Sequence, residues 1–289
     1  MEILNPSPVL CLPQAMWLTY QVIMNAPGLD QDQVLSVVVP DSLRSRTPQD
    51  GAHSRRALTG LRELGLVTED DTGMLMADRL SSASEFLRIL RHRIVVPPSS
   101  VSTDYVGAPD LRAGLIWLMR QSPFAPLHQD AVQVEMPKGL FTNDTRWNGF
   151  RWWSQALGFS QPALAVLSKV PDQKAKIVPD PTEAVVDAIC FPFGEPLPRN
   201  TALPIMRLLD FLRAELPVLP GHASATYDGL KDADDHGVRV LGLALSSAEQ
   251  RGILTMAYQS DPSGVVALPD AHDFGRSRYV STVTIRANE

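Results

Sequence analysis

Five arginines between residues 44 and 62 are the side chains whose type and spacing most clearly suit a chemical task, the binding of phosphate groups. They are Arg44, Arg46, Arg55, Arg56 and Arg62. A guanidinium group is always charged, and its planar set of donors matches phosphate oxygens or the edge of guanine. Arg55 and Arg56 stand at the start of a predicted recognition helix, the end that points into the major groove. We therefore predict that these five arginines contact double-stranded DNA; a protein contact or an ordinary solvated face is the alternative.

The acidic residues offer a different chemistry. Three aspartates and a histidine lie within Asp232–His236, and a smaller group lies within Asp270–Asp273. Such side chains bind metal ions when they converge. Both groups fall in predicted loops, so we interpret them as solvated; a divergent metal-dependent nuclease using Asp232–His236 is the alternative. Glycine-rich phosphate loops and a Gly-x-Ser-x-Gly elbow do not occur. We expect no catalytic residues, no cofactor, no metal site, and a protein that is not an enzyme.

The predicted recognition helix lies within His53–Val67. Its apolar residues recur at helical spacing, and Gly65 stands where a left-handed residue ends a helix. Val67 begins an extended segment that turns and returns at Met74–Met76. The order helix, glycine, strand, polar turn and strand is typical of a recognition helix followed by a wing.

This pattern resembles the winged-helix family of DNA-binding domains. Leu61–Val67 reads Leu-x-x-Leu-Gly-Leu-Val, a frequent ending of that family's recognition helix, and the resemblance covers residues 13–80. Many winged helices bind protein instead of DNA. The turn Glu69–Asp71 is acidic and would repel phosphate, which argues against simple duplex binding.

Two prolines and two serines at residues 97–100 disfavour helix and separate a first module, residues 1–98, from the rest. Within it we expect helices over 14–24 and 31–38 before the recognition helix.

A middle segment, residues 99–198, is expected to be helical. A helix capped by Asp110 is predicted over 110–121, and Asp180 with Glu183 predicts a capped helix start. Trp147, Phe150 and Trp153 share one face of a further helix, which favours a core position over the stacking of nucleobases.

A third segment, residues 199–289, repeats the order of the first. Helices are expected over 200–215 and 237–250, then wing strands over 253–258 and 265–268, with a further alternating strand over 280–285. This second module is acidic, because residues 216–274 hold three basic and eight acidic residues. An acidic winged helix reads DNA poorly, so we favour a protein interface here.

Composition limits the class of protein. The 289 residues carry a net charge of −6, which excludes a general nucleic-acid coat but allows a local basic surface. No apolar run reaches the roughly 20 residues of a membrane helix. Met1–Pro6 lacks a signal-peptide pattern. Cys11 and Cys190 have apolar neighbours and predict buried free thiols. We expect a cytoplasmic protein without membrane contact.

Several segments, taken in order, resemble the DpdG proteins of bacterial anti-phage clusters associated with 7-deazaguanine DNA modification. They are Phe150–Phe159, Val178–Ala184, Leu216–Gly221, Leu243–Leu245 and Gly252–Leu254. The resemblance spans most of the chain. It implies a non-catalytic component of a multi-protein defence assembly and supplies no catalytic residues.

Together these observations predict an α+β fold, mostly α, in which tandem winged-helix-like modules flank a helical middle segment. The expected role is a non-catalytic DNA-binding or scaffold subunit of a multi-protein anti-phage defence complex, with double-stranded DNA and other defence-system subunits as partners. A stand-alone winged-helix transcriptional regulator is the alternative.

Overall fold

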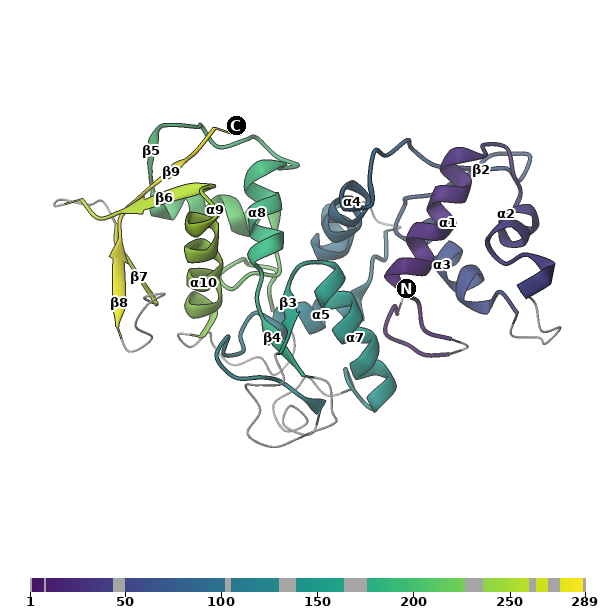
Figure 1. Ribbon diagram of the computed structural model, residues 1–289, viewed down its shortest axis with the longest axis horizontal. Coiled ribbons are helices and arrows are strands. Elements are labelled where there is room, and N and C mark those ends of the chain that lie inside the picture. Colours follow the sequence, from purple (N-terminus) through teal and green to yellow (C-terminus); the bar gives the residue numbers. More distant parts are fainter. Residues whose placement is uncertain are drawn as a thin grey trace. The chain divides into compact units, whose positions relative to one another are not determined.

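A computed structural model describes the fold of nine stretches of the chain (Figure 1). These stretches are residues 2–7, 9–43, 50–101, 105–129, 139–163, 176–226, 236–259, 264–269 and 276–287. They are α+β and mostly helical, with small antiparallel sheets, which confirms the predicted fold class. No helix within these stretches is long and apolar enough to cross a membrane.

The chain forms two compact units. Unit 1 comprises Met1–Gly114 with Lys138–Leu157, and unit 2 comprises Leu115–Pro137 with Gly158–Glu289. The middle segment proposed from the sequence contributes residues to both units. The division at residues 98 and 198 stays a prediction.

Unit 1 begins with three helices and a two-stranded hairpin. These elements are α1 (Pro13–Asn25), α2 (Gln31–Val38), α3 (Ala52–Glu63), β1 (Thr68–Glu69) and β2 (Leu75–Met76). The first three match the predicted helices within one or two residues. Asp30 caps α2 in a capping box with Gln33. Gly65 ends the α3 region in the left-handed conformation, with φ +67°. A short 3-10 turn, η1 (Asp41–Leu43), follows α2.

One backbone hydrogen bond also joins the hairpin of unit 1 to the segment before α2. The Leu75 N–H donates to the Leu29 carbonyl at 2.9 Å, while the sheet itself consists of β1 and β2. Along the chain, Leu29 thus stands between α1 and α2, and α3, β1 and β2 follow.

The rest of unit 1 is helical and surrounds an aromatic core. It contains α4 (Ala83–Val95), η2 (Pro98–Ser100), the start of α5 (Pro109–Leu118) and α7 (Asp144–Ala156). Trp147, Phe150 and Trp153 of α7 are at most 3% exposed, which confirms their predicted core position. The Trp153 indole donates to the Cys11 carbonyl at 2.8 Å, so its polar atom is satisfied inside the core.

Unit 2 contains a helical layer and three small sheets. Its helices are α8 (Thr182–Cys190), α9 (Ile205–Glu215) and α10 (His236–Gln250). Its strands are β3 (Ser160–Pro162), β4 (Ile177–Pro179), β5 (Ala202–Pro204), β6 (Leu254–Ala257), β7 (Val266–Pro269), β8 (Ser277–Val280) and β9 (Thr282–Ile285). β3 pairs with β4, and β5, β9 and β6 form a three-stranded sheet in that spatial order. Along the chain the elements follow as α8, β5, α9, α10, β6, β7, β8 and β9.

Three sequence predictions about unit 2 are wrong in detail. The helix expected from residue 200 begins only at Ile205, because Ala202–Pro204 pairs with β9 and proline disfavours helix before it. The strands expected to form one wing do not pair with each other. β6 pairs with β9 and β7 pairs with β8, because the strand expected over 280–285 breaks at Ser281.

Two helix starts also differ from prediction. Asp110 lies inside the first turn of α5 instead of capping it. At α8 the capping residue is Pro181, and Glu183 forms an ion pair with Arg251 at 2.7 Å instead of a capping box. Both cysteines are free thiols; Cys11 is buried, but Cys190 is only half-buried.

Two glycines of unit 2 allow a matched test of packing. Gly158 and Gly252 both have left-handed backbones, with φ +76° and +74°. A Cβ on Gly158 would lie 2.9 Å from the Glu183 Cβ and 3.0 Å from the Ala184 nitrogen, whereas a Cβ on Gly252 meets no atom within 4 Å.

We expect Gly252→Ala to lower the free energy of unfolding by about 1–2 kcal/mol, the cost of an alanine in this conformation. Gly158→Ala should cost about 1–3 kcal/mol more, because overpacking adds to the same backbone cost. Urea unfolding measures both values; equal losses in the two variants would contradict the packing described at Gly158.

Candidate nucleic-acid interface

The candidate interface is one face of α3. Its other face is buried through Ser54, Ala57, Leu58, Gly60 and Leu61, and the helix contacts α1. At 100° per residue, Arg55, Arg56 and Arg62 fall on the opposite side with Thr59 and Glu63. Arg55, Thr59 and Glu63 are exposed, while Arg56 and Arg62 are half-buried. The structure thus brings three of the five predicted arginines to one helix face. Arg44 and Arg46 lie outside the described residues.

Arg55 is the most exposed arginine of this face. It stands in the first turn of α3, and its Nη1 would lie 3.4 Å from a Cβ on Gly51, the residue that begins the helix. The Arg55 carbonyl accepts a hydrogen bond from the Thr59 hydroxyl at 3.1 Å. Its guanidinium group is therefore near the helix start, where the free N–H groups already favour an anion.

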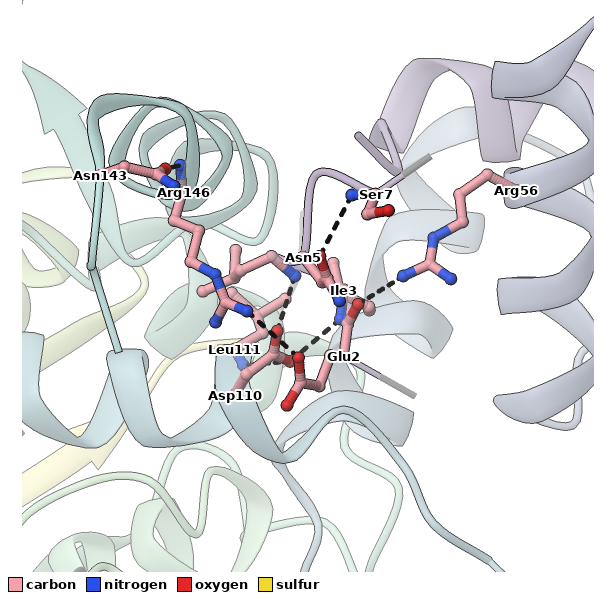
Figure 2. A network of polar contacts seen from close by, with 10 residues as sticks. Glu2, Ile3, Asn5, Ser7, Arg56, Asp110, Leu111, Asn143 and Arg146 are labelled. Atoms are coloured by element: carbon pink, nitrogen blue, oxygen red, sulfur yellow. Dashed lines mark hydrogen bonds and ion pairs between the residues drawn. The ribbon is translucent and has the colours of Figure 1, made fainter. Parts of the chain in front are cut away.

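Arg56 is held by the N-terminal segment of the chain, residues 2–7 (Figure 2). Its Nη2 donates to the Glu2 carbonyl at 2.6 Å. The Glu2 carboxylate forms an ion pair with Arg146 of α7 at 3.2 Å. Arg56 thus takes part in a network that joins α3, α7 and the N-terminal segment.

The same segment is anchored by a buried carboxylate of α5. Asp110 accepts hydrogen bonds from the N–H groups of Ile3, Leu4 and Leu111, at 3.0, 2.7 and 2.8 Å. Burial raises the pKa of Asp110 above its usual value, although the three N–H groups act in the opposite direction. Ile3 and Leu4 are fully buried, so the position of Glu2 is fixed by both packing and hydrogen bonds.

Arg62 is engaged within the module. It forms an ion pair with Glu69 of β1 and donates to the Gln31 side chain at 3.3 Å. Arg62 therefore connects α3 with the hairpin and with α2, a structural task that the sequence analysis did not foresee.

Two of the three acidic residues in the turn Glu69–Asp71 form contacts that stabilise the turn. The Asp70 carboxylate accepts hydrogen bonds from the Thr72 hydroxyl at 2.7 Å and from the Thr72 and Met74 N–H groups at 2.9 Å. The Thr72 hydroxyl, with these N–H groups, lowers the pKa of Asp70. Glu69 is paired with Arg62. Two of the three acids therefore shape the turn, and Asp71 is exposed.

In unit 2, α10 takes the place of α3, because it is the third helix of the series α8, α9 and α10. Other residues cover the side of α10 that faces away from the core. Gly242 and Ser246 lie on the side away from the core residues Leu245 and Ala248, yet both are buried. β7 contacts α10, and a Cβ on Gly242 would lie only 2.5 Å from the Pro269 Cδ. The hairpin β7–β8 thus closes this side of α10 (Figure 1).

An ion pair holds this hairpin to α10. Arg278 of β8 pairs with Glu249 of α10 and donates to the Met256 carbonyl at 2.7 Å. The Met256 N–H donates to Glu249 at 2.7 Å, so the two side chains also satisfy the outer edge of β6. Burial acts to raise the pKa of Glu249, but the hydrogen bonds from Arg278 and Met256 outweigh it and the pKa is lowered.

The other candidate chemistry stays untested. Most of Asp232–His236 and all of Asp270–Asp273 lie outside the described residues. Within the part that the structure describes, no three His, Cys, Asp or Glu residues gather as metal ligands.

A family model described as DpdG-like matches residues 1–262, most of the chain. The chain therefore belongs to the DpdG-like family, which confirms the resemblance drawn from its segments and links it to Dpd-type DNA-modification and defence systems. No curated protein and no solved structure matches it.

The lowered pKa of Glu249 predicts a pH dependence of stability. Folding favours the ionised form of Glu249, which therefore adds to the free energy of unfolding. This contribution is present above the pKa of the unfolded state and is lost as the pH falls through the lower pKa of the folded state. The Glu249→Gln variant should lack this part of the pH dependence. Its free energy of unfolding should therefore be lower than that of wild type near neutral pH, and the two values should converge in acid.

Urea unfolding between neutral pH and pH about 3 measures the effect. Glu195→Gln, a substitution of an exposed carboxylate in the same unit, is the control and should follow wild type. A constant difference between Glu249→Gln and wild type at every pH would refute the assignment.

Proposed function

We propose that this protein is a non-catalytic DNA-binding and scaffold subunit of a multi-protein anti-phage defence complex. In this proposal unit 1 contacts duplex DNA through α3, and the C-terminal part of unit 2 holds a partner subunit. The observation that carries the proposal is the face of α3 that holds Arg55, Arg56 and Arg62, with Arg55 exposed at the helix start, in the position of a recognition helix and followed by a hairpin.

The order of elements supports a winged-helix reading of both modules. In unit 1, α1, Leu29, α2, α3, β1 and β2 follow one another, and Leu29 accepts a backbone hydrogen bond from Leu75. In unit 2, α8, which precedes residue 199, is followed by β5, α9, α10, β6 and, after β7 and β8, by β9, and β5 pairs with β9. A winged helix places its third helix in the major groove and its strands beside the DNA backbone.

Charge and exposure support DNA contact by the first module alone. Arg55 is exposed at the start of α3, next to helix N–H groups that favour phosphate. On α10 the corresponding side is closed by Pro269 and Leu268 of β7. A helix covered in this way cannot enter a groove without displacing the hairpin.

The second module suits a protein partner better. Tyr279 of β8 is 61% exposed, and Val265, which directly precedes β7, is 43% exposed. Tyrosine is enriched at the centre of protein interfaces. A scaffold subunit would co-purify with products of neighbouring genes, whereas a stand-alone regulator would form a symmetric dimer on a palindromic site.

We expect Arg55→Ala to weaken duplex binding and to reduce the salt dependence of the affinity. Loss of one phosphate contact lowers the slope of log K against log salt by about 0.9. Fluorescence anisotropy with a labelled duplex at several salt concentrations measures both quantities.

Arg207→Ala removes an exposed arginine of α9 in unit 2 and is the matched control. It should leave the affinity and the slope unchanged. If Arg55→Ala binds duplex as wild type does at every salt concentration, α3 is not the DNA-contacting face.

A further inference from the structure

Two arginines from different helices converge on Glu2. Arg56 reaches its carbonyl oxygen from α3, at 2.6 Å, and Arg146 reaches its carboxylate from the first turn of α7, at 3.2 Å. Figure 2 shows the two guanidinium groups approaching Glu2 from opposite sides. Residues 56 and 146 are far apart in the sequence, so this pairing exists only in the folded unit.

The backbone around this pair is firmly placed. The Asn143 side chain accepts a hydrogen bond from the Arg146 N–H at 2.9 Å and so fixes the start of α7. Asp110 holds the N–H groups of Ile3 and Leu4, whose side chains are fully buried. The Glu2 side chain, in contrast, is 56% exposed, whereas Arg146 is only 18% exposed.

We infer that Arg56 and Arg146 form an anchor for one phosphodiester group of duplex DNA, which the Glu2 carboxylate occupies on the Arg146 side when DNA is absent. This inference rests on the proposed function and adds Arg146 and Glu2 to the interface. Glu2 then acts as an internal competitor that weakens DNA binding.

Three features carry the inference. Arg146 pairs with the Glu2 carboxylate and Arg56 bonds to the carbonyl oxygen of the same residue, and guanidinium groups bind phosphate through charge-assisted hydrogen bonds. Arg56 and Arg55 belong to the same turn of α3, so the anchor includes a residue of the helix that carries the exposed arginine of the proposed interface. Finally, the exposed Glu2 side chain can swing away from Arg146 while Ile3 and Leu4 stay buried, and the bond from Arg56 to the Glu2 carbonyl does not depend on that side chain.

The charges set the direction of the effect. Around Glu2 the two arginines face two carboxylates, those of Glu2 and Asp110, so the local formal charge is balanced. Removal of the Glu2 charge leaves one positive charge in excess, which favours an incoming phosphate. Removal of Arg146 leaves a negative excess and opposes it.

The test measures duplex affinity by anisotropy for two variants with opposite expected signs. Glu2→Gln should bind about two- to fivefold more tightly than wild type, the range of an exposed ion pair. Arg146→Ala should bind about two- to fivefold more weakly and lose about 0.9 from the salt slope. Circular dichroism confirms that each variant is folded, and either variant alone can decide the question.

Matched controls remove one charge of each sign elsewhere. Glu195→Gln and Arg207→Ala change exposed residues of unit 2 and should both bind as wild type does. Inorganic phosphate, added at constant ionic strength, should not displace the duplex. If low millimolar phosphate displaces it, the two arginines bind free phosphate and the inference is overturned.

The failure of this inference is distinguishable from failure of the proposed function. If Arg55→Ala weakens binding but Glu2→Gln and Arg146→Ala match their controls, the anchor is wrong and the α3 interface stands. If Arg55→Ala also has no effect, both are wrong.

Discussion

The arrangement of unit 1 depends on one buried carboxylate, that of Asp110. A carboxylate taken out of water is costly unless hydrogen bonds replace its hydration. Here three backbone N–H groups do so, and two of them belong to Ile3 and Leu4 at the other end of the unit's sequence. The N-terminal segment is thereby fixed against α5, which places Glu2 between α3 and α7 and determines what Arg56 and Arg146 can reach. The basic face of α3 is thus shaped by a residue that carries no role in binding itself.

The two modules show how one order of elements can give different surfaces. In unit 1 the hairpin is short, Arg62 ties it to α3 through Glu69, and Arg55, Thr59 and Glu63 of α3 are exposed. In unit 2, β7 and β8 lie between β6 and β9 in the sequence, β7 packs against α10, and Arg278 of β8 pairs with Glu249 of α10. Gly242 permits this close approach, because a side chain there would collide with Pro269. The difference supports DNA contact by the first module and protein contact by the second.

Local patterns predicted the local elements well. The spacing of apolar residues gave α1, α2 and α3 within one or two residues, and Gly65 has the left-handed backbone expected of a helix stop. Pairing between distant segments could not be read from the sequence. The strand partners in unit 2 depend on the break at Ser281, which alternation alone does not reveal. The partners of Arg56 and Arg62 were missed for the same reason: a helical wheel shows which side chains share a face, but not which side chains from other elements meet them.

The central claim is that α3, and not α10, contacts duplex DNA. Site-specific photo-crosslinking tests it directly, with a crosslinking amino acid placed at Thr59 of α3 or at Gln250 of α10, both of which are exposed. We predict a crosslink to labelled duplex from position 59 and none from position 250. A crosslink from position 250, with none from position 59, would contradict the account.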